Sequence, residues 1–182
     1  MTTRDAEMDD QSIVEPFVIS RTFDAPREVV FRTFSEDDRM RHWWGPEGSR
    51  LIASQMDLRP GGIYHYGLQA SDGSTMWGRF VYREIAAPER IVFSNSFSDA
   101  KGAITRHPLR PQWPLELLST FLFEDAGSER TKVTVIWVPI NESAAERREF
   151  DTNRESMTRG WSGTFDRLQS YLAGLKSPAA NV

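Results

Sequence analysis

The side chains that most often perform chemistry in proteins are sparse in this sequence. It has no cysteine, which excludes thiolate metal sites and cysteine nucleophiles. The three histidines, His42, His65 and His107, follow neither a His-x-His nor a His-x-x-x-His spacing, so they predict no zinc site. No Gly-x-Ser-x-Gly, phosphate-binding P-loop or Gly-x-Gly-x-x-Gly motif occurs. We therefore expect no metal, no cofactor and no catalytic residue; enzymatic activity stays uncertain, and its absence is favoured.

The segment 98–114 carries the strongest remaining polar candidates. It spans seventeen residues between two strand-like runs, which is long for a simple connection and is typical of a lid or binding loop. Within it, Arg106, His107 and Arg110 could close over a carboxylate or phosphate group, a role for which the guanidinium is suited. The alternative, which is common for charges on loops, is that these side chains are only solvated.

Two adjacent tryptophans, Trp43 and Trp44, stand directly before a Gly45-Pro46 break. Neighbouring positions on a helix point about 100° apart, so the two rings cannot share one face. We expect one ring to enter the core and the other to lie at the edge of a site. Trp44 is the candidate for the site, but the sequence leaves open which ring faces inward.

Composition and charge limit the classes of partner. The chain has 182 residues, a net charge of −4 and a pI near 5.5, which argue against binding nucleic acid or an anionic membrane surface. No apolar run approaches the roughly 20 residues of a membrane span, and the N-terminus has no apolar signal region. We expect a cytoplasmic protein that forms one domain; its oligomeric state stays unknown.

The pattern of apolar residues predicts the order of elements. Residues 1–12 and 177–182 are expected to be flexible tails on a single domain at 13–176. An alternating run at 13–25 predicts a strand, and two short helices should follow it at 26–36 and 37–44. Six further period-two runs, most of them joined by short turns, predict an antiparallel meander at 49–58, 62–70, 75–87, 90–97, 115–125 and 131–140.

The C-terminal part returns to a helical period. Ser143 and Glu146 have the spacing of a capping box, which marks a helix start. Apolar residues at helical spacing then form one stripe that predicts a helix from the low 150s to 175, namely Phe150, Met157, Trp161, Phe165, Leu168, Leu172 and Leu175. Gly160 interrupts this stripe.

Three stretches of the sequence resemble the START-like (SRPBCC) helix-grip superfamily. They are FDAPREVVFRTFSEDDRMRHWWGP, then DLRPGGIYHYGL with DGSTMWGRFVYREIAAPERIVFS, and finally GWSGTFDRLQSYL. Within the superfamily the chain is similar to the family named for the activator of the 90-kDa heat-shock chaperone's ATPase, and to a bacterial subgroup of it. The resemblance covers about residues 15 to 175. It implies an α+β fold in which a curved, about seven-stranded antiparallel sheet surrounds a long C-terminal helix.

The resemblance also implies an apolar tunnel between the sheet and the helix. Strand alternation and the helical stripe then select the lining, and plain core packing is the alternative for each residue. We expect the following side chains to contact a small apolar ligand: Trp44, Tyr64, Tyr66, Phe80, Phe93, Asn95, Phe97, Trp113, Leu117, Ser119, Phe121, Trp137, Met157, Trp161 and Phe165.

Three classes of function are compatible with these expectations. The favoured one is a non-catalytic carrier or sensor of a small apolar molecule. The second is an interaction module of the chaperone-activator kind, although we expect only the helix-grip domain here and no additional chaperone-contacting domain. The third is an enzyme resembling polyketide cyclases or hydratases, in which Tyr64, Tyr66, Asn95 and Ser119 would be the polar groups of the tunnel. No dominant acid–base pair supports the third class.

Overall fold

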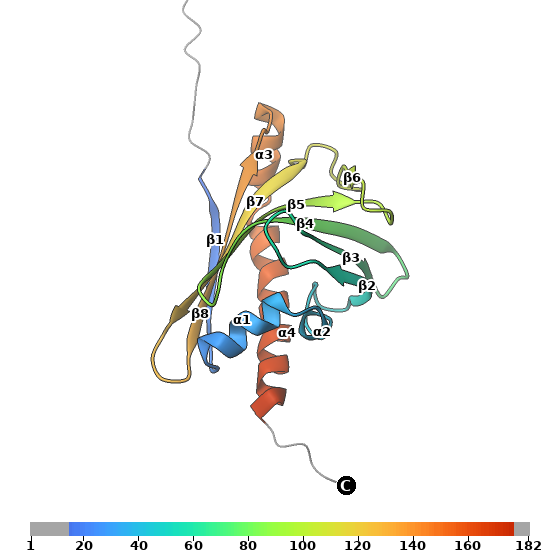
Figure 1. Ribbon diagram of the computed structural model, residues 1–182. Coiled ribbons are helices and arrows are strands. Elements are labelled where there is room, and N and C mark those ends of the chain that lie inside the picture. Colours follow the sequence, from blue (N-terminus) through green and yellow to red (C-terminus); the bar gives the residue numbers. More distant parts are fainter. Residues whose placement is uncertain (1–14, 177–182) are drawn as a thin grey trace, which may run out of the picture.

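A strongly curved antiparallel sheet covers one side of a long C-terminal helix in the computed structural model, which describes residues 15–176 (Figure 1). The strands are β1 (Phe17–Phe23), β2 (Arg50–Met56), β3 (Ile63–Gln69), β4 (Thr75–Ala86), β5 (Arg90–Ser98), β6 (Ile104–Thr105), β7 (Glu116–Asp125) and β8 (Thr131–Ile140). The helices are α1 (Arg27–Ser35), α2 (Asp37–Met40), α3 (Ala144–Thr152) and α4 (Arg154–Lys176). The two tails expected at 1–12 and 177–182 lie outside the described residues.

The α+β helix-grip architecture predicted from the sequence is confirmed. Seven strands form one continuous path in the order β1-β8-β7-β5-β4-β3-β2, and every pairing is antiparallel. The eighth strand, β6, lies inside the segment expected to be a loop. It forms because Ile104 and Thr105 turn back and pair with Ser98 and Phe97 at the end of β5.

The second short helix ends earlier than the sequence predicted. After Met40 the chain tightens into a turn, in which the amide of Trp43 bonds to the carbonyl of Met40. Gly45 then adopts a φ of +105°, a conformation that favours glycine and redirects the chain toward β2. The tryptophan pair therefore stands on a turn and not on the helix itself.

The C-terminal helical region consists of two helices. The predicted capping box is present at the start of α3, where the Ser143 hydroxyl accepts from the Glu146 amide and the Glu146 carboxylate accepts from the Ser143 amide. Asn153 ends α3 with φ −100° and ψ 11°, and its carbonyl accepts from the Met157 amide at the start of α4. The predicted long helix is thus α4. Within residues 15–176, no helix combines the length and the apolar character needed to cross a membrane.

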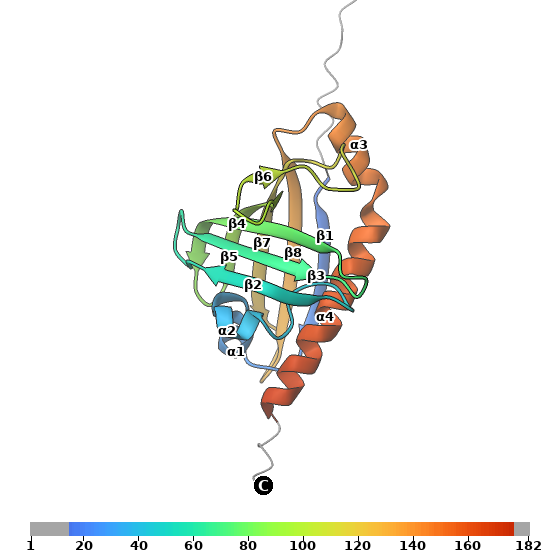
Figure 2. The same cartoon turned by 90° about the vertical axis from the view of Figure 1, so that its right-hand side faces the viewer.

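Aromatic rings fill most of the space between the concave face of the sheet and α4. Phe23 meets Phe165 edge to face at 5.5 Å, and Phe34 from α1 meets Phe121 at 5.0 Å. Each large apolar side chain contributes roughly 1.5–3 kcal/mol when it is buried. Figure 2 shows the arrangement: the sheet faces α4, and α1 with α2 covers the sheet's lower end. This layer of rings holds the sheet and the helix at a fixed spacing, which is the condition for a defined cavity between them.

Candidate ligand-binding site

A cavity of about 270 Å³ lies between the concave face of the sheet and α4. It receives side chains from β3, β4, β5, β7, β8 and α4, from the turn after α2 and from the segment that follows β6. Twelve of the side chains expected to line a tunnel do line it: Trp44, Tyr66, Phe80, Phe93, Asn95, Phe97, Trp113, Leu117, Phe121, Trp137, Met157 and Trp161. Strand alternation and helical periodicity therefore identified the cavity-facing positions on most of these elements.

Three residues of the predicted lining, Tyr64, Ser119 and Phe165, do not border this cavity. Tyr64 is fully buried beside Tyr66, with ring centroids 5.1 Å apart, and its hydroxyl lies 3.2 Å from the Ser54 hydroxyl. Phe165 is fully buried in the solid core, and Ser119 is fully buried behind Asn95. All three point to the correct face, but alternation alone does not report how far along that face the cavity extends.

The cavity is also lined by residues outside the predicted ligand-contacting set, of which His107 and Arg110 were considered only for an anionic ligand. They are Gly45, Pro46, Leu68, Met76, Trp77, Gly78, Ser96, His107, Arg110, Asn153, Ser156, Gly160 and Thr164. On α4 these residues, Ser156, Gly160 and Thr164, stand four positions apart, beside the Met157–Trp161 stripe. Ser156 and Gly160 are exposed, and a Cβ added at Gly160 would meet no atom within 4 Å. The interruption of the helical stripe at Gly160 was the available signal, because it marks an opening at the helix surface.

Trp44 forms one wall of the cavity. Its ring stands edge-on to Tyr66 and Phe80, at centroid distances of 5.7 and 5.4 Å and interplanar angles of 87° and 90°. It meets Trp161 from α4 at 5.9 Å. Edge-to-face contacts of this kind are favourable beyond the area they bury. Trp44 therefore connects the turn after α2 with both the sheet and the helix.

Gly78 provides the space for the Tyr66 ring. A Cβ at Gly78 would lie 2.5 Å from the Tyr66 hydroxyl oxygen, so the phenol packs directly over the backbone of β4. The sequence left open whether Gly78 marks room for a ligand or a bend of the sheet; that room is taken by Tyr66. Burial raises the pKa of Tyr66 to about 12, so its hydroxyl stays protonated at neutral pH.

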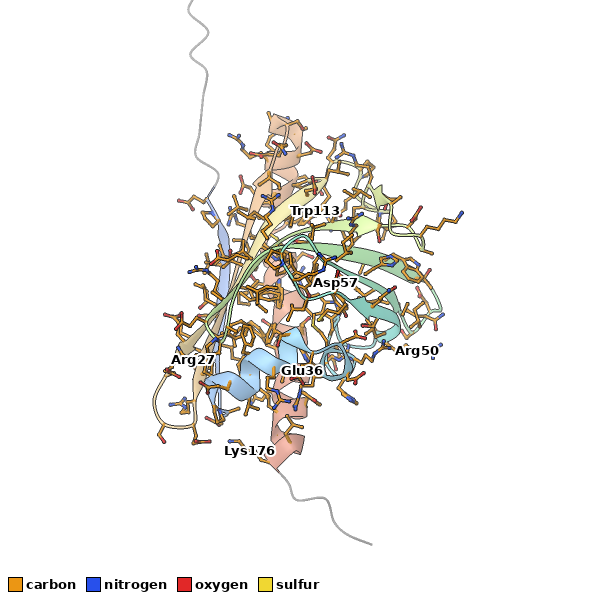
Figure 3. The ribbon with its side chains drawn as sticks, in the orientation of Figure 1. Arg27, Glu36, Arg50, Asp57, Trp113 and Lys176 are labelled. Carbon is orange, nitrogen blue, oxygen red and sulfur yellow. The ribbon has the colours of Figure 1, made fainter. Side chains whose placement is uncertain are left out.

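The segment that follows β6 lies beside α3. Arg106 forms an ion pair with Glu146 of the capping box, and Arg110 forms one with Glu149 at 3.1 Å. Trp113 packs on Phe150 of α3 with centroids 5.8 Å apart, and Figure 3 shows it at the upper end of the molecule. The expectation that Arg106 and Arg110 close over an anionic ligand is thus not supported, since both guanidinium groups pair with carboxylates of α3.

The polar chemistry of the site is limited. Burial and the nearby Arg110 lower the pKa of His107, whose Nδ1 accepts from the Leu109 amide at 3.0 Å. Asn95 presents an amide, whose Oδ1 accepts from the Ser119 hydroxyl. Among residues 15–176 there is no group of three or more His, Cys, Asp or Glu side chains that could hold a metal ion. The arrangement is suited to enclosing an apolar molecule and offers few groups that could move a proton.

An antiparallel sheet that curves around one long C-terminal helix, with an apolar cavity between the two, defines the helix-grip class of α+β proteins. The profile of the family described as Activator of Hsp90 ATPase homolog 1-like protein matches residues 24–173, and the chain belongs to this family. The helix-grip fold commonly binds hydrophobic ligands.

Solved bacterial structures share the fold. A protein from Arthrobacter aurescens superimposes with a TM-score of 0.73 at 22% identity, over 91% of this chain and 88% of that chain. Proteins from Rhodobacter sphaeroides (TM-score 0.70, 15% identity, 90% and 96% covered) and Nitrosomonas europaea (0.69, 18%, 88% and 96%) are similar to it as well. At these identities the likeness supports the fold alone. A comparison with curated protein sequences finds no significant match.

Proposed function

We propose that this protein binds a small apolar molecule in the cavity between the sheet and α4, as a non-catalytic carrier or sensor. The observation that carries the proposal is the cavity itself, about 270 Å³ in volume and lined mainly by apolar side chains, ten of them Phe, Tyr or Trp. An engineered apolar cavity of about 150 Å³ already binds benzene, so this space is sufficient for a ligand with one or two rings. Close packing fills protein interiors, and an unfilled apolar volume of this size is therefore a feature to explain.

No specific observation favours either of the other two classes of function. An enzyme resembling polyketide cyclases would need groups that exchange protons near neutral pH. Tyr64 and Ser119 do not line the cavity, and the raised pKa of Tyr66 makes its hydroxyl a weak acid. For an interaction with a chaperone, the name of the family is the only argument, and no feature of residues 15–176 adds to it.

Two glycines of α4 offer a test of ligand binding that does not depend on damage to the fold. Gly160 lines the opening of the cavity, whereas Gly174 lies two residues from the helix end and does not line it. An added Cβ meets no atom within 4 Å at either position. Replacing Gly160 with leucine should stabilise the helix by up to about 1 kcal/mol, and replacing Gly174, in the last turn, should not destabilise it.

The measurement is titration with N-phenyl-1-naphthylamine, a neutral apolar dye that fluoresces when it leaves water. We expect the wild-type protein and Gly174→Leu to bind it with equal affinity. Gly160→Leu should bind it at least roughly tenfold more weakly, a change of about 1.4 kcal/mol, because the leucine narrows the opening. Equal binding by all three proteins, or no binding by the wild type, would contradict the proposal.

A further inference from the structure

Asn95 is a polar side chain in the apolar part of the cavity. It stands on the concave face of β5, opposite Phe80 on β4 and Leu117 on β7. Its Oδ1 accepts a hydrogen bond from the Ser119 hydroxyl. Its Nδ2 donates to no residue within 15–176, and the side chain is only partly buried because it borders the cavity. The Oδ1 atom of Asn95 thus already accepts a hydrogen bond, whereas its Nδ2 atom is free to donate one.

The surroundings of Ser119 determine which way this amide points. Ser119 is fully buried, and its cross-strand partners are Phe93 and Trp137, neither of which has a side-chain acceptor. Asn95 Oδ1 is therefore the acceptor available to the Ser119 hydroxyl proton, and a flipped amide would leave that proton without one. With Oδ1 held by Ser119, Nδ2 is the part of the amide that remains for a ligand.

Three other polar side chains that line the cavity already use donors, whereas the indole Nε1 of Trp161 is, like Asn95 Nδ2, without a partner. The Thr164 hydroxyl donates to the Gly160 carbonyl at 3.0 Å. Asn153 Nδ2 donates to the carbonyl and to the carboxylate of Glu149, at 2.7 and 3.0 Å. Arg110 pairs with the same carboxylate. Asn95 Nδ2 is partly exposed in the free protein but loses its water when an apolar ligand fills the cavity, so a ligand that brings an acceptor to it binds more tightly than a pure hydrocarbon does.

We propose, resting on the proposed function, that the ligand is an apolar molecule with a neutral carbonyl-type acceptor, which Asn95 Nδ2 binds, and that Ser119 is the positioning residue for this amide. A neutral acceptor fits better than a carboxylate. An anion in the cavity would lose its water, and the cation that lines it, Arg110, is already paired with Glu149.

The test compares three probes of nearly equal shape by isothermal titration calorimetry. They are 2-acetylnaphthalene, its isostere 2-isopropenylnaphthalene, in which CH₂ replaces the oxygen, and 2-naphthoate. The quantity of interest is the ratio of ketone affinity to alkene affinity, because damage to packing weakens both and leaves their ratio unchanged. Asn95→Leu and Ser119→Ala should each lower this ratio about 3- to 10-fold, the value of one neutral hydrogen bond. Ser170→Ala, which removes a hydroxyl on the exposed face of α4 that donates to the Asp166 carbonyl and does not line the cavity, should keep the wild-type ratio.

Each outcome decides the matter. If Asn95→Leu and Ser119→Ala retain the wild-type ratio, the inference is overturned and ligand binding itself stands. If Asn95→Leu does not fold, Ser119→Ala alone makes the same distinction. If the wild type binds 2-naphthoate more tightly than the ketone, the inference that the ligand's acceptor is neutral is overturned. Failure of the wild type to bind either uncharged probe overturns the proposed function, and this inference with it.

Discussion

Trp43 and Trp44 are neighbours in the chain but contact different parts of the molecule. Trp43 is fully buried against Phe34 of α1, with ring centroids 4.5 Å apart, and its Nε1 donates to the Thr33 carbonyl at 3.1 Å. Trp44 contacts Tyr66 of the sheet and borders the cavity. The sequence predicted that the rings diverge, and they do, at an interplanar angle of 86°. It could not predict which ring faces which way, because the turn after Met40 sets that direction.

Two aromatic residues one turn apart on α4 differ in what their rings touch. Phe165 is fully buried in the core, where it meets Phe23, while one side of Trp161 borders the cavity. Phe165→Ala should therefore lower the free energy of unfolding by roughly 3–5 kcal/mol, the usual effect of removing a ring from a close-packed core. Trp161→Ala should lower it by less, although the indole is larger, since part of its surface already faces a void. Urea unfolding of the two variants measures both values.

If Trp161 borders a cavity, Trp161→Ala must lower the free energy of unfolding less than Phe165→Ala does. If Trp161→Ala destabilises the protein as much as Phe165→Ala or more, the indole is surrounded by protein on all sides. Parallel curves with equal m-values are needed for this comparison, because a changed m-value would indicate a changed unfolded state.

At the scale of the elements, the sequence predicted the faces of the strands and the order of the sheet. Leu117 and Phe121 on β7 and Phe93 on β5 all lie on the concave face, as alternation indicates. The cavity's extent was not predictable, because it depends on how the sheet bends. Irregularities in register, between Leu51 and Ala53 and between Tyr82 and Glu84, contribute to that bend, and they follow from tertiary packing.

The contact between the segment after β6 and α3 could not be predicted from the sequence either. Arg106 and Glu146 are forty residues apart, and no periodicity relates them. The capping box identified Glu146 as part of a helix start, but the same carboxylate has a second oxygen that is free to pair with a distant cation. One side chain thus joins two elements, which gives an element-scale prediction.

Glu146→Gln should remove the ion pair with Arg106 and keep the helix cap, because glutamine also accepts the capping hydrogen bond. The hydrogen bond from Arg106, with those from Ser143, holds the pKa of the Glu146 carboxyl below its usual range. A lowered folded-state pKa means that the charged form stabilises the fold above the ordinary pKa of about 4.3 and that this stability is lost as the pH falls. At pH 7 the variant should be less stable by about 1 kcal/mol or less, since Arg106 is half exposed and solvent screens the pair.

The pH dependence distinguishes this effect from general damage. As the pH falls through the folded-state pKa of Glu146, the difference between the wild type and Glu146→Gln should shrink toward zero. Glu155→Gln is the matched control, because the Glu155 carboxylate is 93% exposed and its partner Arg159 is 3.6 Å away. Chemical unfolding at several pH values measures all three proteins. A difference that persists unchanged at low pH would show that the ion pair is not its source.

At the scale of the whole molecule, α4 is attached to segments far apart in the sequence. Arg21 on β1 donates to Asp166 at 2.5 Å. On the neighbouring side of the helix, Arg167 Nη1 lies 3.0 Å from the Gly45 carbonyl and 3.1 Å from the Pro46 carbonyl. Figure 1 shows α4 between β1 and α2, and Figure 2 shows it along one side of the curved sheet. The helix therefore closes a space that the sheet alone would leave open.

Arg167 should contribute more to the free energy of unfolding than its position on a polar helix face indicates. Its guanidinium is partly buried, burial lowers its pKa, and it binds the carbonyl groups of the turn that carries Trp44. Hydrogen bonds to a charged group contribute about 1.5–3 kcal/mol, so Arg167→Met, which keeps the apolar stem, should lower the free energy of unfolding by roughly that amount. Because the freed turn forms one wall of the cavity, affinity for N-phenyl-1-naphthylamine should fall as well. Arg159→Met, on the same helix but 72% exposed, should change neither quantity. If both variants behave alike in urea unfolding and in dye titration, the turn is held by its own packing and α4 does not set the wall of the cavity.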